Sequence, residues 1–348
     1  MFGSKQLLLT VFLSMSLWSV IAQKHWTRVK EELVFTNPPF KSCHASTIVE
    51  TQNGKLLIAC FGGTAEGQKD VSIWLCHLNS KLPHTARAVA NGLVNDTLRY
   101  AAWNPVLFKE RSGKLFLFYK VGPNPREWWG MVKTSADNGI TWSAPIRLPN
   151  GILGAIKNKP VQLSNGIILS PSSVEEKSGR WKAHIELSAD KGHSWSAVQL
   201  DTSKAFDLIQ PSILIYKNHT LQVLCRSKQG NIIQAWSYNN GKTWSKLSKT
   251  SLLNPNSGID AVTLKSGKQL VVYNPDVPGK DWFNGRAKLN LACSIDGKTW
   301  KDVAILENGD KQEYSYPAII QTKDGLIHIT YTYDRHNIKH VVFKEGDL

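Results

Sequence analysis

Several residues that could transfer protons, stack on a ligand or bind an anion stand at the starts of short apolar segments. His44 carries an imidazole, which can be neutral and basic near pH 7 and so suits proton transfer. Trp103, beside Asn104, offers a flat ring on which the face of a sugar could stack. Lys157 and Lys159 together suit a sulfate or carboxylate group. These residue types fit an anionic ligand with sugar-like faces.

The segments that follow these residues must position them. The first one reads CHASTIVETQNGKLLIACFGG, over residues 43–63, and five others share its form. Each alternates apolar and polar residues, turns at Gly or Asn, and runs into a second apolar strand, which predicts a β-hairpin. The hairpins begin 50 to 60 residues apart, at His44, Asn104, Asn158, Gln210, Asp260 and Tyr316.

A second motif recurs with nearly the same period. The turn SADNGITW ends at Trp142, and related turns end at Trp195, Trp244 and Trp300, at intervals of 53, 49 and 56 residues. In such a turn a short Asp or Asn accepts hydrogen bonds from the turn backbone, and Gly takes a positive φ. We therefore expect these turns, including their aspartates, to be structural and to join outer strands.

The two periods together predict the fold class. Repeats of about 50 residues that each hold four strands are typical of a radial array. Six of them make an all-β, six-bladed β-propeller. The early segment HWTRVKEELVF, residues 25–35, has no hairpin partner and is expected to supply the outer strand of the last blade.

The start of the chain predicts export. Residues 1–22 combine a basic residue, Lys5, an apolar run and small residues before Gln23, as in a secretory signal peptide. Residues 23–348 are then a single propeller domain, secreted or periplasmic, with no membrane insertion. The five cysteines show no metal-ligand spacing and are interpreted mainly as packing residues, so no metal or other cofactor is expected.

The formal net charge of +15 bears on the partner. A basic exported protein attracts polyanions over long range. Because the sequence holds no nucleic-acid motif or basic tract, an acidic or sulfated carbohydrate is the favoured partner and nucleic acid is not expected. The protein is expected to be a monomer.

The recurring turns are Asp-boxes, and residues 40–345 resemble the sialidase (neuraminidase) superfamily with BNR repeats. In that family the first strands of the blades start near the central axis. Three arginines bind a carboxylate there, a tyrosine paired with a glutamate acts as nucleophile, and an aspartate acts as acid/base. The resemblance implies that Arg226 and Arg286 are the second and third arginines and that Tyr314 is the tyrosine.

Other positions depart from the family pattern. His44 stands where the first arginine is expected, and Gln210 stands where the glutamate partner of the tyrosine would be. A glutamine cannot accept the tyrosine proton, so the usual activation of the nucleophile is missing. Asp70 is the candidate acid/base aspartate, with Glu66 as its competitor.

Three functions remain open on these residues. The first is β-elimination on a uronate sugar by a lyase or dehydratase, in which His44 and Tyr314 exchange protons and Arg226 and Arg286 neutralise the carboxylate. The second is a retaining, sialidase-type glycoside hydrolase that releases a terminal acidic sugar. The third is a propeller that only binds glycans. We favour elimination, because that reaction needs no nucleophile. Substrate contacts are expected from a further set of residues: Trp103, Asn104, Lys157, Lys159, Gln210, Asp70, Glu66 and Asp260.

Overall fold

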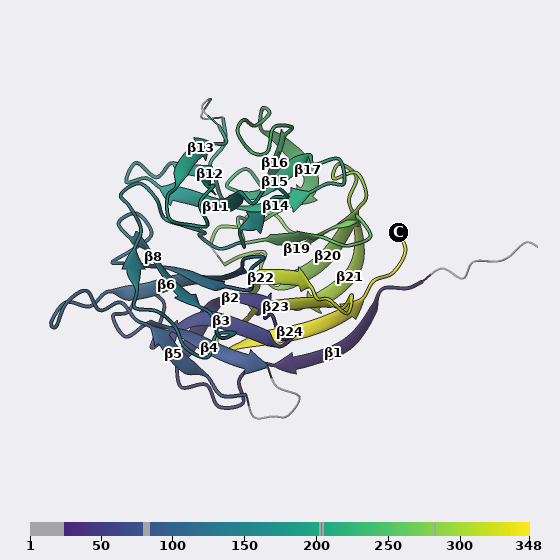
Figure 1. Cartoon of the computed structure of the whole chain (residues 1–348). Coiled ribbons are helices and arrows are strands. Elements are labelled where there is room, and N and C mark those ends of the chain that lie inside the picture. Colours follow the sequence, from purple (N-terminus) through teal and green to yellow (C-terminus); the bar gives the residue numbers. More distant parts are fainter. Residues whose placement is uncertain (1–23, 79–83, 202, 204, 282) are drawn as a thin grey trace, which may run out of the picture.

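A computed structural model describes residues 24–78, 84–201, 203, 205–281 and 283–348. The proposed leader lies outside the described residues. Within them the chain is all-β and forms six antiparallel sheets of four strands, set radially around a central axis (Figure 1). The six-bladed propeller predicted from the repeats is confirmed. The described chain contains no helix with the length and apolar character needed to cross a membrane.

The first three blades follow the chain in order, each from its inner to its outer strand. Blade 1 holds β2 (Ser42–Glu50), β3 (Leu56–Gly63), β4 (Ser72–Leu78) and β5 (Arg87–Ala90). Blade 2 holds β6 (Ala101–Lys109), β7 (Leu115–Gly122), β8 (Trp129–Ser135) and β9 (Ile146–Arg147). Blade 3 holds β10 (Val161–Gln162), β11 (Ile168–Glu175), β12 (Trp181–Ser188) and β13 (Ser196–Gln199).

The last three blades complete the ring. Blade 4 holds β14 (Leu208–Ile215), β15 (Leu221–Ser227), β16 (Asn231–Ser237) and β17 (Ser248–Leu253). Blade 5 holds β18 (Asp260–Thr263), β19 (Gln269–Tyr273), β20 (Lys288–Ser294) and β21 (Lys301–Asn308). Blade 6 holds β22 (Tyr314–Gln321), β23 (Ile327–Tyr333), β24 (Asn337–Lys344) and β1 (Thr27–Leu33).

Blade 6 joins the two ends of the described chain. Its outer strand β1 pairs antiparallel with β24, from Thr27 opposite Lys344 to Leu33 opposite Lys339, and Figure 1 shows the two strands side by side. The expectation that the early segment closes the last blade is confirmed. Because β1 pairs with the outer edge of β24, the backbone groups on that side of β24 are not left without hydrogen-bond partners.

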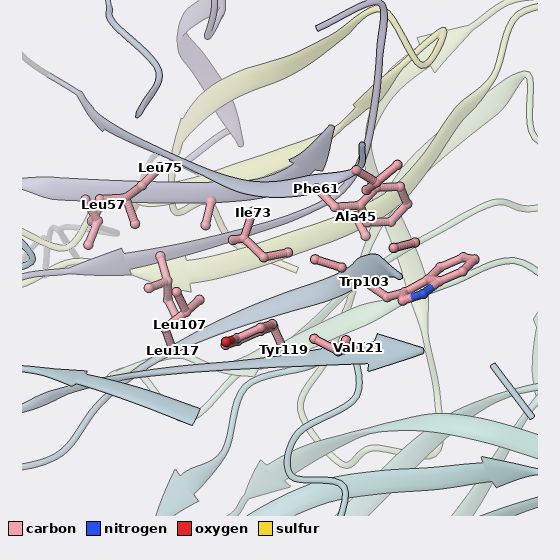
Figure 2. Close-up of a cluster of buried hydrophobic side chains, with 14 of the residues drawn as sticks. Ala45, Leu57, Phe61, Ile73, Leu75, Trp103, Leu107, Leu117, Tyr119 and Val121 are labelled. Atoms are coloured by element: carbon pink, nitrogen blue, oxygen red, sulfur yellow. The ribbon is translucent and has the colours of Figure 1, made fainter. Parts of the chain in front are cut away.

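The core lies between neighbouring blades. Between blades 1 and 2, Leu57, Ile73 and Leu75 face Leu107 and Leu117, and all five are fully buried (Figure 2). These side chains come from alternate positions of their strands, as the period-two pattern requires. Burying one such side chain contributes about 1.5–3 kcal/mol, so the sheets are held together mainly by apolar packing. All five cysteines are buried and unpaired, which agrees with a packing role.

The four Asp-box turns connect the third and fourth strands of blades 2 to 5, and so lie on the outer part of each blade. In the first turn the Ser135 hydroxyl donates to Asp137, 2.7 Å, and accepts from the amide of Gly139, 2.9 Å. The Asp137 carboxylate also accepts the amide of Thr141, 2.9 Å. Trp142 packs into the core between blades 1 and 2. These contacts support the structural role expected for the boxes.

Candidate functional site

Four inner strands carry a β-bulge near their first residues, and the bulge decides which side chains turn toward the axis. The ladder shifts after His44 in β2, Trp103 in β6, Ile209 in β14 and Ser315 in β22. The residue that follows each of these has a positive φ: Ala45, Asn104, Gln210 and Tyr316. In three of the four bulges proline comes next, and proline cannot donate to a strand ladder. In blade 1 the bulge residue equivalent to Asn104, Gln210 and Tyr316 is therefore Ala45, and His44 is the residue before it.

These bulges help to gather polar side chains from four blades into one group. We call this group the axial cluster, and it consists of His44, Gln210, Arg226, Asn256, Arg286, Glu313, Tyr316 and Arg335. Three arginines and one glutamate give it a positive balance, and the fully buried Lys157 lies near it, with its ammonium 6.0 Å from the centre of the Tyr316 ring.

Tyr316 is half-buried and holds a central place in the cluster. Its hydroxyl oxygen accepts an N–H of Arg226 at 2.8 Å and the side-chain amide of Gln210 at 3.4 Å. The Arg226 guanidinium therefore lies on the side of the lone pairs of this oxygen. The hydroxyl proton of Tyr316 is consequently directed away from the guanidinium.

The other contacts of Arg226 fix its direction. Its Nε donates to the side-chain oxygen of Asn256 at 2.9 Å. Its guanidinium also lies 5.2 Å from the centre of the Trp181 ring, within the range of a cation–π contact. Arg226 is nine-tenths buried. Its contacts with Tyr316, Asn256 and Trp181 hold the charged guanidinium in one position.

Glu313 links the other two arginines. Its carboxylate accepts Arg286 at 3.0 Å and Arg335 at 2.7 Å. Burial opposes ionisation of this carboxyl, but the hydrogen bond and charge of Arg335, with the charge of Arg286, lower its pKa. Arg286 also donates to the backbone oxygen of Asn256 at 3.4 Å. Asn256 is thus the shared neighbour of Arg226 and Arg286, which places the two predicted arginines together.

His44 lies beneath the ring of Tyr316. The two ring centres are 4.1 Å apart with their planes inclined by 49°, and His44 is only 1% exposed. Its Nδ1 lies 2.9 Å from the hydroxyl of Thr332. Burial, followed by the charges of Arg335, Arg286, Arg226 and Lys157, lowers the pKa of His44 well below its ordinary value. The imidazole is therefore neutral at physiological pH.

Glu66 and Asp70, the two candidates for an acid, lie in different surroundings. Glu66 is joined to the cluster because it accepts Arg335 at 2.6 Å, and its side chain is 39% exposed. The carboxylate of Asp70 instead accepts the amide and the hydroxyl of Thr64, both at 2.7 Å. Of the two, Glu66 is the one in contact with a residue of the axial cluster.

The structure places Tyr314 apart from the contacts that surround Tyr316. Its ring packs against Tyr333 with 5.1 Å between centres, in an apolar cluster between blades 5 and 6. Burial, then a hydrogen bond with Tyr333, raises the pKa of Tyr314. In a regular strand Tyr314 and Tyr316 would lie on the same face. The bulge that begins after Ser315 instead turns Tyr316 toward Arg226.

The two lysines and Asp260 are occupied by the protein itself. The ammonium of Lys157 donates to the backbone oxygens of Ile259 and Pro317, and burial lowers its pKa to about 7. Lys159 pairs with the buried carboxylate of Asp260. That carboxylate also accepts the Ser212 hydroxyl and the amide of Ile319, both at 2.9 Å. These contacts give the three side chains a role in holding blades 3 to 6 together at the axis.

The remaining predicted contacts line the start of blade 2. Trp103 is 6% exposed and donates its ring N–H to the backbone oxygen of Gly122 at 2.9 Å. Its ring meets Phe61 and Trp128 edge to face, so it serves mainly as a packed wall. Asn104 stands at the bulge, in the position equivalent to Tyr316.

Sequence reasoning missed Arg335, Glu313, Asn256 and Trp181. A signal existed for Arg335, because it follows the second strand of a hairpin, just as Arg226 ends one, and such ends return to the axial face. The turn that holds it is tied to blade 1, since the amide of Cys43 donates to the backbone oxygen of Arg335 at 2.7 Å. Asn256 lies in the loop between β17 and β18, and Trp181 is the first residue of β12. The sequence repeat does not align these two positions with the other blades.

The cluster can bind an anion and move a proton. Arginine side chains recognise carboxylates with paired N–H groups, and Tyr316 presents an oriented hydroxyl beside them. No group of three or more histidine, cysteine, aspartate or glutamate side chains suited to a metal ion occurs among the described residues.

Comparison with known proteins agrees with this architecture. The BNR repeat-like domain matches residues 54–329. The chain belongs to this family and, by its fold and repeats, to the superfamily of sialidase-like BNR propellers. A sialidase of Bacteroides fragilis strain YCH46 is 23% identical to it over 260 residues, which cover 65% of this chain and 45% of that protein. The chain thus spans less than half the length of this curated relative.

Solved structures show the same fold at low identity. A Dyadobacter fermentans protein of unknown function superposes with a TM-score of 0.76 at 15% identity, covering 92% of this chain and 99% of that one. A Trypanosoma rangeli sialidase superposes with a TM-score of 0.72 at 17% identity, covering 91% of this chain and 59% of that one. A Hadza microbial sialidase gives 0.72 at 16% identity, covering 87% and 66%.

Proposed function

We propose that this protein is an exported enzyme that acts on a carboxylate-bearing sugar by β-elimination. The observation that carries the proposal is the environment of the Tyr316 hydroxyl. Its hydrogen-bond partners are Arg226 and Gln210, and no carboxylate of the described chain bonds to it. A tyrosine nucleophile of the retaining type depends on an adjacent base, whereas a tyrosine that exchanges protons does not.

The proposed step uses the cluster as follows. Arg226, Arg286 and Arg335 supply positive charge for the substrate carboxylate, which makes the neighbouring C–H bond more acidic and stabilises the enolate. That C–H bond breaks, its electron pair forms the new carbon–carbon double bond, and the bond from the β-carbon to the glycosidic oxygen breaks. Tyr316 gives its hydroxyl proton to the departing oxygen, and its own oxygen takes up the proton lost from carbon, so the hydroxyl is regenerated.

In this proposal His44 supports Tyr316 more than it contacts the sugar. The imidazole is almost fully buried and lies directly against the phenol ring, so its first effect is to fix the ring. Being neutral, it adds no further positive charge to the cluster. From the sequence, the proton transfers were divided between His44 and Tyr314, whereas this proposal assigns them to Tyr316.

A sialidase-type hydrolase is the second candidate, and the comparisons favour it. The curated relative and two of the solved structures are named sialidases, and the fold and the arginines suit a carboxylated sugar. Gln210 weighs against this candidate, because it occupies the neighbourhood in which a base for Tyr316 would be needed.

The products distinguish the two reactions. Incubation with a panel of uronate oligosaccharides and sialosides should yield, from a uronate, a product with a double bond conjugated to its carboxylate and new ultraviolet absorbance. Release of free sialic acid without such absorbance would replace elimination by hydrolysis. Failure of every substrate, with retained binding of acidic sugars, would leave a glycan-binding propeller.

A matched pair of variants tests the assignment of the tyrosine. Tyr316→Phe should lower turnover by about 100-fold or more, the usual effect of losing a proton-transfer group, because only the hydroxyl is removed. Tyr314→Phe should stay within severalfold of the wild type, since the hydroxyl of Tyr314 lies in a packed cluster. Equal losses in both variants, or a greater loss in Tyr314→Phe, would return the role to Tyr314.

A further inference from the structure

A large cavity of about 700 Å³ lies between blades 1 and 2, and no residue of the axial cluster lines it. Its walls come from β4, β5, β7, β8 and β9 and from the loop that follows β5. Tyr119 and Val121, which Figure 2 shows on β7, form one wall. Three cationic side chains line the cavity, Arg99, Lys133 and Arg147, and the described lining holds no carboxylate.

Arg147 and Trp129 line the cavity side by side. The guanidinium lies 4.9 Å from the centre of the Trp129 ring, and Tyr100 meets the same ring edge to face at 5.8 Å. Arg147 is exposed, and its guanidinium has no hydrogen-bond or ion-pair partner among the described residues. An arginine held over an indole but unpaired in charge keeps its N–H groups available for an anion.

Arg99 brings a second guanidinium to the cavity. One of its terminal nitrogens donates to the backbone oxygen of Asp70 and to the hydroxyl of Ser72, both at 2.9 Å. Its Nε is buried and has no hydrogen-bond partner in the described chain. An unpaired buried donor costs free energy, and an anionic group in the cavity would remove that cost.

The rest of the lining is apolar where a sugar ring would lie. Leu93 and Val94 are 55% and 47% exposed, and both border the cavity together with Trp129 and Met131. A cavity with cations, aromatic rings and exposed aliphatic groups suits a ligand that has both negative charge and C–H faces. Acidic saccharides have both features.

We propose that this cavity is a second binding site of the protein, which takes an acidic saccharide carrying carboxylate or sulfate groups. Arg147 and Arg99 bind the anionic groups, and Trp129 with Leu93 and Val94 packs against the sugar faces. The proposal does not depend on the reaction at the axial cluster, because the two sites share no residue.

Calorimetric titration tests the site once the axial cluster is weakened. In an Arg226→Ala background, a tetragalacturonate and a heparin-derived tetrasaccharide serve as the carboxylated and sulfated probes, and maltotetraose as the neutral one. We expect at least one acidic probe to bind and the neutral one not to bind. Adding Arg147→Ala or Trp129→Ala should raise the dissociation constant by about tenfold or more, which corresponds to about 1.4 kcal/mol.

Lys249→Ala is the matched control. Lys249 is an exposed cation on blade 4, away from the cavity, so its loss changes the net charge as Arg147→Ala does. It should leave the dissociation constant within twofold. Equal effects of the two charge variants would reduce the result to net charge and overturn the proposal. So would absence of binding by both acidic probes, or equal binding of maltotetraose. Circular dichroism of each variant excludes misfolding, and Arg147 is exposed enough to be replaced without disturbing the core.

Discussion

At the scale of single residues, the proposed proton transfer depends on the surroundings of the Tyr316 hydroxyl and the His44 imidazole. Tyr316 and His44 are in ring contact, and the arginines around them act on both. An imidazole that is buried among cations is kept neutral, because its protonated form would lose hydration and gain repulsion. The state of His44 therefore does not follow solution pH in the ordinary range.

This state of His44 can be measured without a substrate. Nitrogen-15 NMR of the imidazoles at pH 5.5 should show His44 still neutral. His44→Gln identifies the resonance by its loss. If His44 became protonated near pH 6.5, its neutrality in the proposed mechanism would be wrong.

The sequence predicted His44 at the axial start of a hairpin, and the resemblance to the sialidase superfamily named Arg226 and Arg286. The structure brings these three side chains into one cluster. The resemblance also named Tyr314, whereas the structure brings Tyr316 into contact with Arg226, because a bulge of one residue reverses which side chain faces the axis. The sequence could not foresee that Lys157, Lys159 and Asp260 satisfy one another and the backbone. Those contacts link residues 101 to 160 positions apart, and spacing alone does not give their geometry.

At the scale of elements, the Asp-box turns show why a repeat can be read from sequence. Each uses local hydrogen bonds, so the same residues produce the same turn wherever they occur: Ser188 and Asp190 repeat the contacts of Ser135 and Asp137. The blade period and the outer position of the turns were predictable for this reason. The inner strand of blade 3, which has only the two residues Val161–Gln162, was less so.

The stability of one box can be tested at its buried serine. Ser135→Ala removes a hydroxyl that donates to Asp137 and accepts the amide of Gly139, and should lower the free energy of unfolding by about 1 kcal/mol. Urea unfolding measures this, with Ser248→Ala as the control on an exposed strand position. Turnover per folded molecule should not change, and a large loss of activity in a folded variant would show that the boxes do more than join strands.

At the scale of the whole molecule, the ring depends on one blade assembled from both ends of the described chain. A row of titratable groups crosses this closure from β23 through β24 to β1. The Nδ1 of His328 lies 3.0 Å from the Nε2 of His340, whose Nδ1 lies 2.9 Å from the carboxylate of Glu32. Lys30 and His84 also face that carboxylate, at 2.7 and 3.7 Å. Asp324 lies near His328 and partly offsets the effect of burial.

This row should make the closure sensitive to acid. Burial, then the charge of His340, lowers the pKa of His328 to about 4, whereas an unfolded histidine titrates near 6.5. Between these values the unfolded chain binds the proton and the folded chain does not. Stability from this group is therefore complete above about pH 6.5 and falls as the pH drops toward 4, by about 2 kcal/mol between pH 8 and pH 5.

Replacing the histidine isolates its share of the pH dependence. Urea unfolding of the wild type and of His328→Gln at pH 8 and pH 5 should give a smaller loss of stability in the variant, even if the variant is less stable at pH 8. His193→Gln, at an exposed position in an Asp-box turn, should keep the full wild-type loss. Parallel losses in the wild type and His328→Gln would mean that acid acts elsewhere, and the paired carboxylate of Glu32 would be the next group to examine. That group would act at lower pH, because hydrogen bonds from His340 and Lys30 outweigh burial and lower its pKa to about 2.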